Sequence, residues 1–133
     1  MRTRAWQRIA SRRRGFTLIE LLVVMAIMAL LLSIALPKYF DSVDYSKEVA
    51  LKQNLQTMRY AIDRYRGDRG QYPATLQQLV EARYLREIPV DPYLETSTAW
   101  KTLPPPNSGD AGVYDVKSSA ARTGRDGSLA SSW

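Results

Sequence analysis

The chain has 133 residues and contains neither cysteine nor histidine, so one small domain is expected, and disulfides and metal or catalytic sites built on those residues are excluded. Its 19 lysines and arginines outnumber its 13 aspartates and glutamates. Six of the arginines lie within residues 1–15, which hold no acid, and the rest of the chain is neutral overall. A neutral body has no excess charge to neutralise phosphates, so nucleic acid is not an expected partner.

Residues 16–36 form an apolar run that is long enough to cross a membrane as a helix, at about 1.5 Å per residue and about 30 Å of hydrocarbon. Glu20 is its one ionisable residue. A carboxylate at the centre of a membrane helix costs about 2.5–3.5 kcal/mol and by default marks function. The arginines before the run are expected to stay in the cytoplasm, so that residues 37–133 lie beyond the membrane.

Two plainer interpretations of this run are open. It could be a secretory signal with a weak cleavage site at Ser33-Ile34-Ala35, but it is longer than the usual signal core, and Glu20 would have no purpose within it. It could also be an uncleaved anchor, with Glu20 reaching up to the lipid headgroups.

The run is followed by Pro37, which predicts a helix kink because proline removes a hydrogen bond and clashes with the preceding turn. Beyond it, an apolar stripe recurs at steps of four and three, through Leu51, Leu55, Met58, Ile62 and Tyr65. We therefore expect one helix from about Phe16 to Arg66, stopped by Gly-Asp-Arg-Gly at 67–70. Such a helix is about 75 Å long, so its first half must lie in a membrane or among identical helices.

The remaining residues predict a short helix and a small sheet. Thr75 and Gln78 form a capping box, and the short helix is expected to end near Arg83 or Tyr84. Strands are predicted at 98–103 and 112–117, joined by a proline-rich loop. Trp133 is expected to dock on the domain, the alternative being a frayed terminus.

Residues 14–21, Arg-Gly-Phe-Thr-Leu-Ile-Glu-Leu, resemble the leader motif of the type IV pilin superfamily. In that family a prepilin peptidase cuts after the glycine and methylates the new N-terminus. The resemblance implies cleavage between Gly15 and Phe16 and N-methylation of Phe16. The new amine would lie one helical turn from Glu20, which could pair with it or with the amine of a neighbouring subunit and so guide assembly.

The order of the elements is most similar to the major pseudopilins of type II secretion. This similarity implies a pilin-like α+β fold, in which a long N-terminal helix packs on a short helix and a small antiparallel sheet. It implies a cleaved basic leader at 1–15, a transmembrane or filament-core helix at 16–36, and a periplasmic domain at 37–133. The chain would be a single-pass protein of the bacterial inner membrane.

The implied function is structural and not enzymatic: the chain would be a subunit of a pseudopilus, a periplasmic filament that pushes secreted proteins out. The implied partners are other copies of the chain, minor pseudopilins, the prepilin peptidase, and an inner-membrane assembly platform with its cytoplasmic ATPase.

Relatives also bind calcium in the C-terminal loop. Here that loop, 118–132, holds a single acid, Asp126. Asp126 with Asp115 and backbone carbonyls is one candidate calcium site, although calcium prefers six to eight oxygens, and an Asp-Gly turn is the plainer reading.

Two alternative classes remain open. A minor pseudopilin, or a subunit of a type IV or competence pilus, would share the first 37 residues. The presence of Glu20 favours a stacked position, because tip subunits of the family can lack this glutamate. An enzyme or an anchored binding module is the other class, but the sequence shows no nucleophile motif or suggestive pair of carboxylates, and 67–70 is no nucleotide fingerprint because no strand precedes it.

Overall fold

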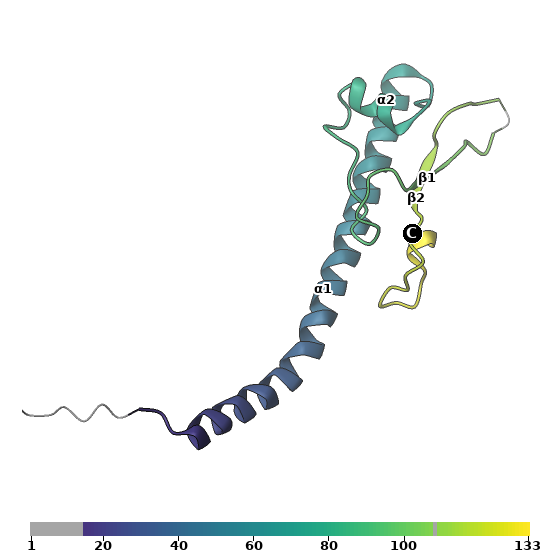
Figure 1. Ribbon diagram of the computed structural model, residues 1–133. Helices are drawn as coiled ribbons and strands as arrows, with labels where there is room; N and C mark the ends of the chain where they lie inside the picture. The colour runs from purple at the N-terminus through teal and green to yellow at the C-terminus, as the bar shows by residue number, and fades with distance from the viewer. Residues whose placement is uncertain (1–14, 108) are drawn as a thin grey trace, which may run out of the picture. The chain divides into compact units, whose positions relative to one another are not determined.

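The computed structural model describes residues 15–107 and 109–133. In chain order its elements are α1 (Leu18–Arg69), α2 (Leu76–Glu81), β1 (Trp100–Leu103), β2 (Asp115–Ser118) and the 3₁₀ helix η1 (Ala130–Ser132). β1 and β2 pair antiparallel (Figure 1), so the predicted α+β class with a long helix, a short helix and a small sheet is confirmed. Most of the predicted leader, residues 1–14, lies outside the described residues.

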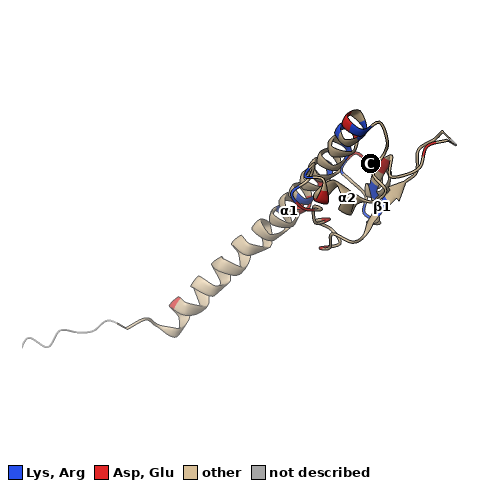
Figure 2. Cartoon of the chain, turned by 90° about the horizontal axis from the view of Figure 1, so that it is seen from above, with Lys and Arg blue, Asp and Glu red and all other residues tan. Residues whose placement is uncertain are grey.

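Two compact units make up the chain: one reaches to Tyr39, and the other is Phe40–Trp133. In the first unit, the large apolar side chains of α1 are exposed, and Ser33 donates its hydroxyl hydrogen bond to the carbonyl of Ala29 at 3.0 Å. α1 contains a stretch that is apolar and long enough to cross a membrane, as judged by length and composition, and none of that stretch is buried. The first half of α1 is almost entirely uncharged (Figure 2).

α1 continues as helix through Pro37; a kink at that residue stays a prediction, as do the predicted domain boundaries. The helix also runs past its predicted end at Arg66, because Gly67 is tolerated within it and Gly70 is the residue that stops it. Gly70 adopts a left-handed φ of 70° and donates its amide hydrogen bond to the carbonyl of Arg66 at 2.7 Å. Glycine reaches this conformation without the steric cost of a Cβ.

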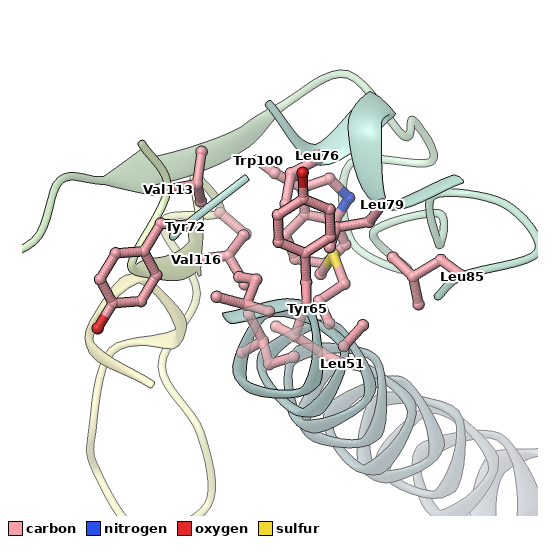
Figure 3. Close-up of a cluster of buried hydrophobic side chains, with 14 of the residues drawn as sticks. Leu51, Tyr65, Tyr72, Leu76, Leu79, Leu85, Trp100, Val113 and Val116 are labelled. Carbon is pink, nitrogen blue, oxygen red and sulfur yellow. The ribbon is translucent and has the colours of Figure 1, made fainter. Parts of the chain in front are cut away.

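The core of the second unit is built on the predicted stripe of α1. All five of its members are at most 1% exposed: Leu51, Leu55, Met58, Ile62 and Tyr65. Figure 3 shows residues of this stripe facing Leu76 and Leu79 of α2, Trp100 of β1 and Val116 of β2. The buried stripe of α1 therefore forms one core cluster with residues of α2, β1, β2 and η1.

α2 begins as predicted, with the Thr75 hydroxyl accepting a hydrogen bond from the amide of Gln78 at 3.3 Å. The Gln78 side chain in turn accepts from the amide of Ala74 at 2.7 Å. The helix ends at Glu81, earlier than predicted. The cause is Arg83, whose φ of 63° lies in the left-handed region and cannot continue a right-handed helix.

Both strands start later than the sequence predicts. β1 begins at Trp100 because the Thr98 amide donates to the Thr96 hydroxyl at 3.2 Å instead of to a ladder. β2 begins at Asp115 because the amide of Val113 is taken by the carbonyl of Pro73, at 2.7 Å. The register pairs Trp100 with Ser118 and Leu103 with Asp115.

Asp91 is a fully buried acid that ties the turn before β1 to β2. Its carboxylate accepts hydrogen bonds from the amides of Tyr93 and Leu94, at 2.9 and 3.2 Å, and from the hydroxyl of Ser118 at 2.5 Å. A buried carboxylate is tolerated only when its oxygens are satisfied in this way. These bonds fix the turn at Asp91-Pro92 against the sheet.

Candidate processing and assembly site

The predicted cleavage position lies in a segment that precedes the first helix. Gly15, Phe16 and Thr17 are non-helical, and α1 starts at Leu18. The side chain of Phe16 is 90% exposed, and a Cβ added at Gly15 would meet nothing within 4 Å. The Gly15–Phe16 bond thus lies in non-helical, accessible chain, where peptidases preferentially cut.

Thr17 and Glu20 form a capping box at the start of α1. The hydroxyl of Thr17 accepts a hydrogen bond from the amide of Glu20 at 3.2 Å, and Oε2 of Glu20 accepts from the amide of Thr17 at 3.3 Å. The Thr17 hydroxyl also lies 3.4 Å from the same oxygen. The pattern Thr-x-x-Glu satisfies two amides that the first helical turn leaves without partners. This second role of Glu20 could have been read from the sequence, since Thr75 and Gln78 were recognised by the same pattern.

The capping box places a negative charge at the positive end of the helix macrodipole, where it is stabilised. In the described part of the chain Glu20 bonds to Thr17, and no hydrogen bond joins it to Phe16. With residues 1–15 attached, the nitrogen of Phe16 is an uncharged amide. The pairing between this nitrogen and Glu20 therefore requires that the chain be cut.

The two carboxylates of the candidate calcium site have other partners. Asp115 lies 2.6 Å from Nε of Arg59, and the same oxygen accepts from the amide of Val116 at 2.7 Å. Asp126 accepts hydrogen bonds from the hydroxyl and the amide of Ser128, at 2.6 and 2.9 Å, and these bonds lower the pKa of its carboxyl. Among residues 15–107 and 109–133 no three acidic, histidine or cysteine side chains gather as metal ligands would. This donor set does not fit a calcium ion, for which six to eight oxygens are needed.

Trp133 docks on the domain, as predicted. Its carbonyl accepts a hydrogen bond from Nη2 of Arg59 at 2.8 Å, its ring lies under the ammonium group of Lys52 at 4.3 Å, and its indole nitrogen donates to the hydroxyl of Ser128. Close packing at Gly124 completes the arrangement, since a Cβ there would clash with the ring. Arg59 was missed from the sequence, because its partners lie 56 to 74 positions further along the chain.

Comparison with known families gives two adjoining matches. The family model for the prokaryotic N-terminal methylation motif matches residues 10–36, and the model for type II secretion system protein G matches residues 38–131. The first match contains Gly15, Phe16 and Glu20, and the second covers the domain described above except for its last two residues.

Several curated proteins are similar over most of their length. The type II secretion system core protein G of Pseudomonas aeruginosa is 28% identical over 132 residues, covering 86% of this chain and 90% of that protein. The protein of the same name from Escherichia coli is 28% identical over 138 residues, covering 92% and 88%. That of Klebsiella michiganensis is 33% identical over 97 residues, covering 61% and 68%. No solved structure matches the chain significantly.

Proposed function

Because the chain belongs to the family of type II secretion system protein G, we propose that it is a major pseudopilin, the structural subunit that builds the filament of such a system. The observation that carries this proposal is the Gly15-Phe16 pair directly before the capping box of Thr17 and Glu20, at the start of an exposed apolar helix. The match over residues 38–131 favours a major pseudopilin over a pilus subunit, since the leader motif alone would not separate the two.

The first step would be cleavage between Gly15 and Phe16 by a prepilin peptidase, with N-methylation of Phe16. The exposure of Phe16 and the open space around Gly15 support it, because neither residue would have to leave a packed position to be cut. Before this step α1 anchors the chain in the membrane, and the arginine-rich residues 1–15 hold its N-terminal end in the cytoplasm. The domain from Phe40 to Trp133 would lie in the periplasm.

Cleavage would change the partner of Glu20. Its present bonds to Thr17, at 3.3 and 3.4 Å, are long for hydrogen bonds to a carboxylate. Bonds between an ammonium group and a carboxylate are shorter, about 2.7–2.9 Å, and roughly twice as strong as neutral ones. The new amine of Phe16, on the same subunit or on a neighbour, would therefore compete with the amide of Thr17. Pairing with a neighbour's amine would set the register of one subunit against the next.

In the filament, the exposed apolar side chains of α1 would bury one another in place of lipid. Assembly would require copies of this chain, minor pseudopilins, and a membrane platform driven by a cytoplasmic ATPase. The growing filament would push secreted proteins outward. The chain itself would perform no chemistry.

Three substitutions separate the two roles of Glu20. Glu20→Gln keeps an acceptor for the capping box but removes the charge, whereas Thr17→Ala weakens the cap and keeps the charge. Ser33→Ala is the control, since this hydroxyl bonds only within its own helix. We expect Glu20→Gln to lose most filaments, and Thr17→Ala and Ser33→Ala to keep them, in electron microscopy of sheared cells. Filaments at the normal level from Glu20→Gln would disprove the charge pairing.

Mass spectrometry of the purified subunit tests the processing step separately. The expected product begins at an N-methylated Phe16. A product that begins at Met1, or just after Ala35, would contradict the proposal and indicate an uncleaved anchor or an ordinary secretory signal.

A further inference from the structure

The C-terminal loop, residues 118–132, lies against α1 at a cavity of about 240 Å³. The wall on the helix side holds three acids, Asp41, Asp44 and Glu48, and the loop contributes Arg122 and Arg125. Positive and negative side chains thus face each other across the place where the loop meets the helix.

Arg122 joins the loop to the helix through its side chain. Its Nη2 lies 3.1 Å from Oδ1 of Asp44, and its guanidinium carbon lies 5.7 Å from the centre of the Tyr93 ring. The backbone of the same residue orders the loop, because its carbonyl accepts a hydrogen bond from the amide of Ala130 at 2.7 Å. One residue therefore holds both the loop and its contact with α1.

Arg125 makes a second connection, through its backbone amide and its ring contact. Its amide donates a hydrogen bond to Oε2 of Glu48 at 3.1 Å, and its guanidinium lies 4.7 Å from the centre of the Tyr45 ring. The other oxygen of Glu48 accepts from Lys52 at 2.7 Å, and Lys52 in turn lies over Trp133. Glu48 is only 8% exposed, so both of its oxygens are committed within the domain.

From this arrangement we propose that Arg122 and Arg125 fasten the C-terminal loop to α1 in place of a bound cation. In a calcium-binding loop, a metal ion supplies the positive charge that draws oxygen ligands together. Here the loop supplies that charge itself through the guanidinium of Arg122 beside Asp44, and the Arg125 amide adds a hydrogen bond to Glu48. Asp115 and Asp126 are held by Arg59 and Ser128 and take no part. The inference concerns the folded domain and does not depend on how the N-terminus is processed.

Trypsin provides the test, because it cleaves after both loop arginines when the loop opens. The full-length protein in detergent is digested with calcium or with EDTA, and cleavage after Arg122 and Arg125 is followed by mass spectrometry. The cleavage rate is expected to be the same with calcium as with EDTA. Faster cleavage in EDTA, or slower cleavage when calcium is added, would overturn the proposal in favour of a metal site.

Two substitutions on α1 leave the trypsin sites intact. Asp44→Asn removes the partner of Arg122 and is expected to speed cleavage after Arg122 and Arg125 by about two- to fivefold, as loss of an exposed ion pair raises the open population. Asp41→Asn is the matched control: Asp41 is an exposed acid at the wall of the same cavity and makes no ion pair within the described residues. Equal rates for the two variants would show that the arginine contact does not hold the loop.

Discussion

The two parts of α1 differ in where their apolar side chains lie. Up to Leu36 the helix is apolar on all sides and its large side chains are exposed, whereas beyond Phe40 its large apolar side chains are mainly confined to one buried stripe. The second part finds its partners within its own chain, namely α2 and the sheet. The first part finds none among the described residues and needs a membrane or other subunits. The difference identifies which half of the helix is concerned with folding and which with assembly.

The largest change in stability is expected when a leucine of the second part, but not one of the first part, is replaced by alanine. Leu55→Ala removes a fully buried side chain and is expected to lower the free energy of unfolding by about 2–5 kcal/mol. Leu31→Ala, at a leucine that is 62% exposed, should leave the unfolding of the domain unchanged. Chemical denaturation of the full-length protein in detergent, followed by tryptophan fluorescence, measures both. Equal effects from the two would contradict the division.

A smaller effect is expected where the domain closes on itself at Gly112. This glycine has a φ of 116°, and an added Cβ would lie 2.7 Å from the carbonyl of Pro73. Gly112→Ala should therefore cost about 1–3 kcal/mol. Gly109→Ala serves as the control, because a Cβ there meets nothing within 4 Å. If thermal unfolding does not distinguish the two variants, the contact between this loop and Pro73 is not needed for stability.

The ion pair of Glu48 and Lys52 makes the stability of the second part of α1 depend on pH. The hydrogen bond from Lys52, followed by that from the Arg125 amide, lowers the pKa of Glu48. The stability contributed by Glu48 is thus present above the ordinary glutamate pKa of about 4.3 and is lost as pH falls through the lowered value. The bond to Glu48 raises the pKa of Lys52, so the contribution of Lys52 is lost only as pH rises through that raised value. Thermal unfolding of Glu48→Gln should show less loss in acid than the wild type shows, whereas Glu81→Gln, at an exposed glutamate, should match the wild type.

The smallest effect is expected for the exposed pair of Lys47 and Glu95. Their charged atoms are 3.9 Å apart, and the side chain of Glu95 is 82% exposed. Solvent and salt screen such a pair, so Glu95→Gln should change the free energy of unfolding by less than about 0.5 kcal/mol. A larger loss of unfolding free energy, measured by denaturation as above, would mean that exposed ion pairs also contribute to the stability of this domain.

Sequence patterns predicted those features that depend on neighbours along the chain. The stripe of α1 follows from its helical period, the start of α2 from its capping residues, the superfamily from residues 14–21, and the likeness to major pseudopilins from the order of the elements. The strand starts were wrong because Thr98 and Val113 are bonded to groups outside the ladder. The contacts of Arg59 and Arg122 were missed because each joins residues more than 50 positions apart, and periodicity carries no information on such pairs. At the candidate site, Glu20 was identified, but its bond to Thr17 was overlooked.

The contacts of Arg59 also make the closing of the domain a late step of its folding. Its guanidinium bonds Asp115, the carbonyl of Val116 and the carbonyl of Trp133. Contacts between residues so far apart form late, because a long loop must close before they are made. Arg59 therefore gains its last partner only once Trp133 has reached the folding domain. Until then, the stripe of α1 is left uncovered by β2 and the C-terminal loop.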